Sequence, residues 1–270
     1  MIDITKLEAS SQLTTVNPSD NIFTELGRNT YTYLDLLSEL IDNSLAAKSA
    51  DSILNVSIDL FVDGNGKGVR FVIQDDAVGI SADSLGLAIT PAGQQAKDSL
   101  NEHGLGMKQA VSALGKLEYL ATKTESDQRA RVIKEFKFGD IPTYTCDFDR
   151  DHGTEISIVE PKPILVTHAP TITRSIVPQL GARYRRFLKP DNKKLNLTLS
   201  LRSAEKPRLP LNEWKIEEVK PVYFHPSSRS NEPVISKHEI VGNGWSARLT
   251  FGYSPNRPEE YEELGLEAGR

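Results

Sequence analysis

Cysteine and long apolar runs are what this sequence of 270 residues most lacks. Its single cysteine, Cys146, can form neither an internal disulfide nor a cluster of thiolate ligands for zinc. No run approaches the roughly 18 consecutive apolar residues that a membrane-spanning helix needs. Residues 1–8 carry acids and lack the apolar segment of a signal peptide. These absences argue against membrane and secreted proteins and favour a reducing compartment, either the cytoplasm or a nucleus.

Positive charge is also scarce. The 32 lysines and arginines are outnumbered by 37 aspartates and glutamates, which gives a formal charge of −5. A basic footprint over the whole chain, as expected of a nucleic-acid-binding domain, is therefore absent. One local basic cluster is the exception, and it either contacts a DNA backbone or forms a solvated helix face. The cluster consists of Arg183, Arg185, Arg186, Lys189, Lys193 and Lys194.

Helical and strand-like patterns alternate from residue 29 onward. Leucines and isoleucines at helical spacing predict a helix over 29–48, with Thr30 as a candidate N-cap. A second helix is expected over 107–114 and ends at Gly115, whereas residues 84–103 are typical of a loop or a loose helix. Alternating apolar residues predict five strands, the first two joined as a hairpin. These strands span 53–62, 69–73, 117–123, 131–138 and 154–159, and two further strands are expected after Pro190, over 195–201 and 241–253.

A boundary is expected after these strands, because several prolines follow and the pattern becomes helical again. We place a domain junction between residues 165 and 195. The predicted organisation is one domain over 1–165, with 1–28 as a lead-in arm, and a linker helix with a partial β-rich domain over 166–270, which reads as truncated. The order of elements predicts an α/β (α+β) two-layer sandwich, with helices on one face of a mixed sheet.

Glu39 and Asn43 lie one turn apart on the polar face of the first predicted helix. A carboxylate can accept a proton from water, and an amide oxygen is a hard ligand that suits Mg²⁺. Asp42 shares this face and could orient Asn43 or a water. The same spacing also occurs in ordinary amphipathic helices with a solvated polar face, so the pattern alone leaves both interpretations open.

Asp75 ends a predicted strand and is followed by Gly79 in a turn. An aspartate there can accept a hydrogen bond from a ligand's amino group, and a glycine lets a flat ring approach the backbone. Thr154, which opens a later strand, can bridge to the Asp75 carboxylate through its hydroxyl or a water. The alternative is that Asp75 closes an Asx turn and that Thr154 is an ordinary β-branched strand residue.

Two glycines precede the second predicted helix, in the run Gly104-Leu105-Gly106-Met107-Lys108. Backbone N–H groups at a helix N-terminus attract phosphate, and Lys108 adds a mobile positive charge. The run is not a Rossmann fingerprint, since the third glycine is missing and no strand precedes it, and the chain contains no P-loop motif. A flexible glycine linker is the alternative.

The order and spacing of these patterns resemble the GHKL (Bergerat-fold) ATPases, which include DNA gyrase B, the Hsp90-type chaperones, histidine kinases and mismatch-repair MutL. In that family a Glu-x-x-x-Asn helix, an Asp-x-Gly-x-Gly turn, a glycine-rich lid and a Gly-Thr strand follow in this order. The resemblance covers residues 30–160. Glu39 argues against the ordinary histidine-kinase branch, and the run from His103 to Lys108 is similar to the microrchidia (MORC) group.

The resemblance implies ATP and Mg²⁺ as cofactors and assigns roles to the residues that match. Asp75 would accept the adenine amino group, with Gly79 and Thr154 beside it. Asn43 would ligate Mg²⁺, and Glu39 would polarise the attacking water. Residues 104–108 would surround the phosphates with backbone N–H groups and the charge of Lys108.

The sequence departs from the family in two places. Ala77 stands where the turn after Asp75 has its first glycine, and no match exists for the lysine that reaches the γ-phosphate from the family's transducer domain. We expect that lysine beyond residue 270, which would make this fragment a slow ATPase. The expected partners are ATP, a second copy in an ATP-dependent homodimer, and DNA. The alternative is a nucleotide-gated clamp or binding module with little turnover, scaffold-like or chaperone-like.

Overall fold

Eight strands form one mixed sheet, in the spatial order β5-β4-β3-β6-β2-β1-β7-β8. The computed structural model describes residues 19–28, 31–91, 104–220 and 235–252. Neighbouring strands of the sheet are antiparallel except β1 and β7, which run parallel. The strands are β1 Leu54–Val62, β2 Gly68–Asp75, β3 Lys116–Lys123, β4 Ala130–Ile133, β5 Tyr144–Cys146, β6 Gly153–Val159, β7 Leu195–Ser203 and β8 Pro210–Ile216.

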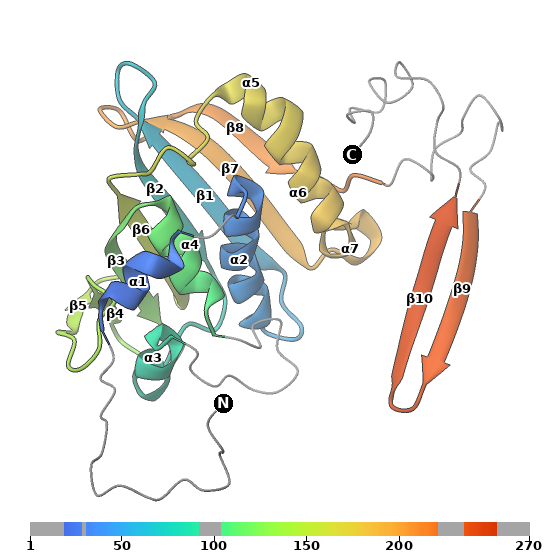
Figure 1. Cartoon of the computed structure of the whole chain (residues 1–270), viewed down its shortest axis with the longest axis horizontal. Coiled ribbons are helices and arrows are strands. Elements are labelled where there is room, and N and C mark those ends of the chain that lie inside the picture. The colour runs from blue at the N-terminus through green and yellow to red at the C-terminus, as the bar shows by residue number, and fades with distance from the viewer. Residues whose placement is uncertain (1–18, 29–30, 92–103, 221–234, 253–270) are drawn as a thin grey trace, which may run out of the picture.

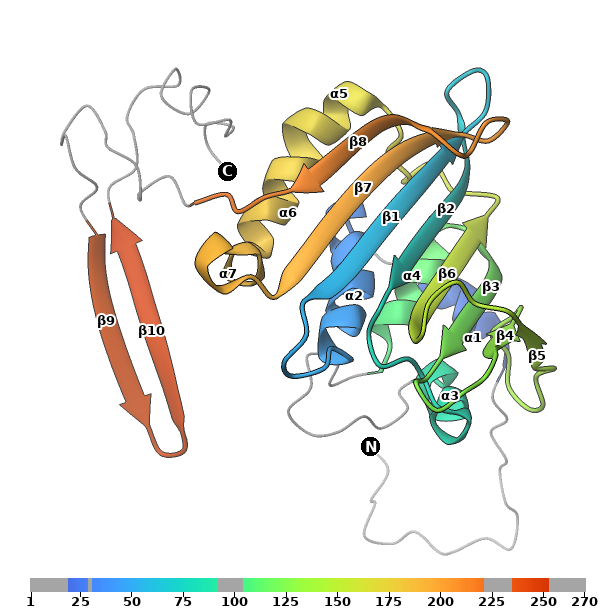
Figure 2. The same ribbon diagram turned by 180° about the vertical axis from the view of Figure 1, so that it is seen from behind.

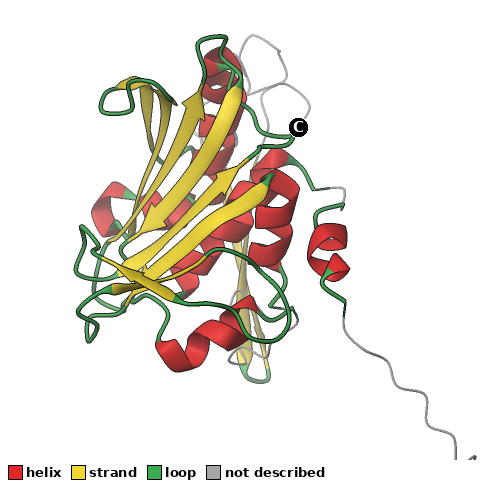
Figure 3. Cartoon of the chain, turned by 90° about the vertical axis from the view of Figure 1, so that its left-hand side faces the viewer, coloured by secondary structure: helices red, strands yellow, loops and turns green. Residues whose placement is uncertain are grey.

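The helices cover one face of this sheet (Figures 1 and 2). Figure 3 shows the sheet from the side of β5, where the strands fan out with the usual twist. The expected two-layer α/β architecture is therefore confirmed. The helices are α1 Asn21–Leu26, α2 Tyr33–Ala46, α3 Ala82–Ile89, α4 Gly106–Leu114, α5 Ala169–Thr171, a π-helical turn Ile172–Ile176, α6 Val177–Arg183, α7 Arg185–Leu188 and a 3₁₀ turn Pro190–Asn192.

The core lies between α2 and the central strands. Alternate residues of β1 and β7 face the helices, and Ile58 and Leu199 are paired across the two strands and fully buried. Ile41 of α2 is buried in the same cluster. Each such side chain contributes about 1.5–3 kcal/mol by leaving water. The period of two in the strands and of 3.6 in the helix thus explains why these segments adopt the predicted types.

The residues beyond the expected domain junction complete this same sheet. β7 pairs with β1 along its whole length, from Leu54 opposite Leu195 to Val62 opposite Ser203. β8 then pairs with β7 at the edge. The division expected at residue 166 therefore falls inside one layered unit, because a parallel strand needs a distant partner that leaves no local sequence signal. The transducer-like domain stays a prediction.

Several boundaries differ from the sequence expectations. The N-cap of α2 is Thr32, which forms a capping box with Asp35, and Thr30 lies outside the described residues. The strand expected over 131–138 ends at Ile133 as β4, and β5 was not expected. Part of the segment expected as a loop or loose helix forms α3, whose N-cap is Ser81.

Gly115 follows α4 for a reason other than the expected C-terminal glycine conformation. Its φ of 168° is extended backbone, which any residue adopts. A Cβ at this position would lie 2.7 Å from the Val159 carbonyl oxygen. The close approach of β6 therefore selects glycine here.

The strand expected over 241–253 is instead a hairpin of β9 (Ile235–Gly242) and β10 (Trp245–Gly252). Three stretches with sequence expectations lie outside the described residues. They are residues 1–18 of the lead-in arm, residues 92–103 before the glycine run, and the tail from residue 253. None of the helices in the described ranges is long and apolar enough to span a bilayer.

Candidate functional site

A cavity of about 310 Å³ opens between α2, the ends of β2 and β6, and the start of α4. It brings together eight residues that the sequence patterns singled out. These are Asn43, Asp75, Gly79, Gly104, Gly106, Met107, Lys108 and Thr154. The rest of its wall is mostly apolar and includes Leu40, Ile73, Ile80 and Ile156. Leu105 is the N-cap residue of α4, and Glu39 borders the cavity through its contact with Gly106.

Asp75 lines this cavity and is almost completely buried, with only 8% of its surface exposed. Its Oδ1 accepts the backbone N–H groups of Ala77 (3.0 Å) and Thr154 (3.1 Å), and its Oδ2 accepts the Ser44 hydroxyl (2.7 Å). Burial raises the pKa of Asp75, and these hydrogen bonds oppose that rise. A carboxylate can accept about four hydrogen bonds, so it retains capacity for a ligand donor.

Thr154 contacts Asp75 differently from the expectation. Its backbone N–H, and not its hydroxyl, reaches the carboxylate, while its Oγ1 lies 3.2 Å from Thr122 Oγ1. Gly153 before it has a φ of 133°, and a Cβ there would lie 2.1 Å from the Asp75 carbonyl oxygen. Glycine at this position therefore lets β6 pass directly beside the end of β2.

The turn after Asp75 is fixed by its backbone. Gly79 has a φ of 72°, and a Cβ there would lie 2.1 Å from the Lys123 carbonyl oxygen, so no other residue fits. Ala77 has no positive φ, and its carbonyl oxygen lies 2.7 Å from His152 Nδ1. Alanine in place of the family's first glycine is therefore compatible with this turn.

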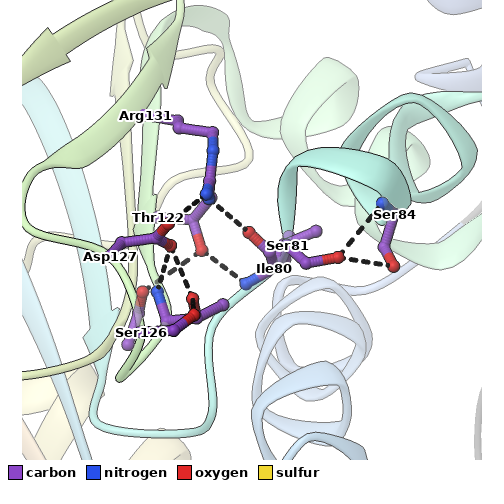
Figure 4. Close-up of polar contacts among 9 residues, drawn as sticks. Ile80, Ser81, Ser84, Thr122, Ser126, Asp127 and Arg131 are labelled. Atoms are coloured by element: carbon purple, nitrogen blue, oxygen red, sulfur yellow. Dashed lines mark hydrogen bonds and ion pairs between the residues drawn. The ribbon is translucent and has the colours of Figure 1, made fainter.

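The base of the turn is anchored by β3 and β4 (Figure 4). The Ile80 N–H donates to Thr122 Oγ1 (2.8 Å), and the Ile80 carbonyl accepts from Arg131 Nη1 (3.2 Å). Arg131 also pairs with Asp127. Hydrogen bonds from Thr124 and this arginine lower the pKa of Asp127 to about 2. These contacts fix the turn at the point where it leads into α3.

Glu39 lies against the start of α4. A Cβ at Gly106 would come within 1.8 Å of Glu39 Oε2, so glycine is required to admit this carboxylate. Burial first, and then the neighbouring charges of Asp42 and Asp35, raise the pKa of Glu39, while Arg183 lowers it. A carboxylate with a raised pKa beside a cavity has the properties of a general base.

Asn43 lies one turn further along α2 and lines the cavity. Its Nδ2 donates to the Glu39 carbonyl oxygen at 2.5 Å, which orients the amide group. Asp42, on the same stretch of α2, accepts a hydrogen bond from Tyr184 (2.9 Å).

The start of α4 supplies the positive end of the site. Its N-cap Leu105 makes no side-chain cap, so the N–H groups of the first turn have no such partner. Lys108 is 2% exposed and donates to the Gly104 carbonyl oxygen at 2.7 Å. Burial lowers the pKa of Lys108 to about 8, so this lysine is a buried and directed charge instead of a mobile one.

The residue types fit Mg²⁺ held jointly with a phosphate ligand. Mg²⁺ usually takes one or two protein oxygens and fills its other positions with phosphate oxygens and water. The Asn43 amide on the cavity wall is such a donor. Within the described ranges, no group of three or more His, Cys, Asp or Glu residues could hold a metal by itself.

Sequence reasoning missed Ser44 and Thr122. Ser44 follows Asn43 directly and is buried against Asp75, but a serine inside a helix gives no distinctive signal. Thr122 contacts the turn from β3, 42 residues away in sequence. Only the register of β3 with β6, which places Thr122 opposite Thr154, reveals this residue.

One residue of the basic cluster also contacts α2. Arg183 forms an ion pair with Asp35 (3.1 Å) and donates to Ser38, and it remains exposed like Arg186 and Lys189. Contact of this cluster with DNA stays a prediction.

Comparison with known proteins agrees with the site geometry. A search of the curated proteins found no match to the chain. Residues 31–142 match the family model described as histidine kinase-, DNA gyrase B-, and HSP90-like ATPase. The matched segment contains α2, the turn after Asp75 and the start of α4, and Thr154 lies beyond it. Residues 31–142 are thus similar to this ATPase family, and the mixed sheet with helices on one face is consistent with the Bergerat fold.

Proposed function

We propose that this chain binds ATP with Mg²⁺ in the cavity beside α2 and hydrolyses it. The observation that carries the proposal is the joining of three elements in one cavity. Asp75 of β2, Asn43 of α2 and the N-terminus of α4, which has no side-chain cap, all line it. The match to an ATPase family over residues 31–142 supports the same conclusion.

The adenine ring occupies the end formed by Asp75 in this proposal. The buried carboxylate accepts the exocyclic amino group, and Ile73 and Ile156 supply apolar surface for the ring. A carboxylate acceptor selects adenine over guanine, because guanine carries a carbonyl oxygen at the corresponding position.

The phosphates lie at the start of α4. The N–H groups of residues 104–107 and the helix dipole attract the negative charge, and Lys108 adds its ammonium group. Mg²⁺, when bound, neutralises phosphate charge, and Asn43 is the residue that holds it. Glu39 accepts a proton from the attacking water, since its carboxylate lies against Gly106 beside the phosphate end.

ATP binding also promotes a homodimer in this proposal, and the process involves DNA. The support is the resemblance of the run ending in Lys108 to the microrchidia group. Light scattering with a non-hydrolysable ATP analogue tests the dimer. A monomer in every nucleotide state contradicts it.

The hydrolysis is tested with Glu39→Gln. Turnover should fall at least about 100-fold while ATP affinity stays within about twofold, because the glutamine cannot accept the proton. Since burial raises the pKa of Glu39, the ionised carboxylate costs stability above that pKa. The melting temperature at pH 7 should therefore not fall.

Glu25→Gln is the matched control, because Glu25 pairs with Arg28 on the surface. A Glu39→Gln protein with wild-type turnover removes Glu39 from the reaction. A wild-type protein that binds ATP and dimerises without measurable turnover would favour the nucleotide-gated binding module instead.

A further inference from the structure

Two consecutive residues at the end of α6 contact the polar side of α2. Arg183 donates from Nη1 to Ser38 Oγ (2.5 Å) and from Nη2 to Asp35 Oδ1 (3.1 Å). Tyr184, only 3% exposed, donates to Asp42 Oδ1 (2.9 Å) and has its hydroxyl 3.3 Å from the Ser38 carbonyl oxygen. The contacted positions follow one stripe of α2 at helical spacing, and Glu39 lies within that stretch.

This contact acts on the electrostatic surroundings of Glu39. Asp35 and Asp42 lie one turn before and one turn after it on α2, and both are engaged by α6. The two aspartates raise the pKa of Glu39, and Arg183 opposes them. From α4, the uncharged Gly106 and its helix N-terminus face the same carboxylate.

The helix α6 is itself held in place from the other side. The Val219 N–H donates to the Gly181 carbonyl oxygen at 3.2 Å. A Cβ at Gly181 would lie 2.4 Å from the Glu217 carbonyl oxygen, so the chain leaving β8 packs directly on the α6 backbone. A helix anchored in this way can fix the position of its neighbour α2.

We propose that Arg183 and Tyr184 are positioning residues: through Asp35, Ser38 and Asp42 they hold the turn of α2 that carries Glu39 against the start of α4. The inference rests on the proposed ATP hydrolysis. It adds a function for the segment after β6 that the family match, which ends at residue 142, does not cover.

Steady-state kinetics of the full chain at pH 7 test this proposal. Arg183→Gln should lower kcat about tenfold with KM within about twofold, because the substrate site is intact but the base is misplaced. Arg183→Lys keeps a positively charged donor for Asp35 and should recover part of the lost kcat.

Tyr184→Phe keeps the ring and removes only the hydroxyl, so it should lower kcat without raising KM. Arg174→Gln, at an exposed arginine of the preceding π-helical turn, is the matched control and should change neither.

The outcomes separate the two claims. If Arg183→Gln and Tyr184→Phe lower the melting temperature but leave kcat unchanged, the contact is only structural and the inference is overturned. If the wild-type chain neither binds nor hydrolyses ATP, the proposed function fails, and the inference fails with it.

Discussion

At the scale of single residues, two buried ionisable groups of the site, Lys108 and Asp75, lower the stability of the fold. Both are nearly inaccessible to solvent. Burial lowers the pKa of Lys108 and raises the pKa of Asp75, and both shifts favour the uncharged form. Groups shifted in this way cluster at functional sites more often than elsewhere. Replacing such a charged group with an uncharged one should therefore stabilise the fold and weaken ligand binding.

Lys108→Met should raise the free energy of unfolding at pH 7 by roughly 2 kcal/mol. The gain arises because the pKa of Lys108 is about 8 in the folded chain, against 10.5 for an ordinary lysine. The lost hydrogen bond to the Gly104 carbonyl oxygen reduces this gain. Between pH 8 and 10.5 the unfolded chain binds more protons than the folded one, so the wild-type protein gains stability as pH rises.

Urea denaturation at pH 7 and pH 10 checks the sign of this prediction. The difference between Lys108→Met and the wild type should narrow at the higher pH. A constant difference would show that Lys108 is not shifted. The variant should also bind ATP more weakly, because a positive charge is lost at the phosphate end.

Gly106→Ala should separate turnover from folding. The added Cβ would overlap Glu39 Oε2, the end of a flexible side chain, so the carboxylate moves while the backbone stays. We expect kcat to fall about tenfold or more, with a melting temperature close to wild type.

Gly86→Ala is the control for this substitution, because a Cβ there meets nothing within 4 Å. It should stabilise α3 by about 0.5–1 kcal/mol and leave kcat unchanged. Equal kcat for Gly106→Ala and the wild type would contradict the position given to Glu39.

At the scale of elements, the sequence predicts what depends on local patterns. The α2 helix, the first hairpin and α4 were found because their periodicity and turns are encoded within each segment. Their site residues could be named for the same reason. The parallel pairing of β1 with β7 could not, since it depends on packing between segments about 140 residues apart.

The same limit applies to side-chain direction. Asp42 shares a helix face with Glu39 and Asn43, yet its partner is Tyr184, which follows it by 142 residues. Arg183 was assigned to a basic surface, although its partner Asp35 is on α2. Contacts between distant helices decide such cases, and no local pattern records them.

The cap of α2 gives a test at this scale. Thr32→Ala should lower the free energy of unfolding by about 1 kcal/mol, because the Asp35 N–H loses its acceptor, the Thr32 hydroxyl. Thr30→Ala, at the position that the sequence pattern favoured, should cost much less. Thermal denaturation compares the two, and a larger loss at Thr30 would contradict the observed cap.

At the scale of the whole molecule, the sheet collects a site from distant parts of the chain. α2 supplies Asn43, β2 supplies Asp75, α4 supplies Lys108, and β6 supplies Thr154 to one cavity. The connection from β6 to β7 contains α6, and Tyr184 at the end of this helix contacts Asp42 of α2. One layer of helices on one sheet is therefore sufficient to build the site and its support.

The most direct test is calorimetric titration of the full chain with Mg²⁺ and ATP, comparing the wild type with Asp75→Asn. Asparagine keeps an acceptor for the Ala77 and Thr154 N–H groups but presents a donor to the adenine amino group. The account predicts binding by the wild type, about tenfold or more weaker binding by Asp75→Asn, and no change in Asp76→Asn, whose carboxylate faces Asn55. Equal ATP affinity in Asp75→Asn and the wild type, or no binding by either, would contradict it.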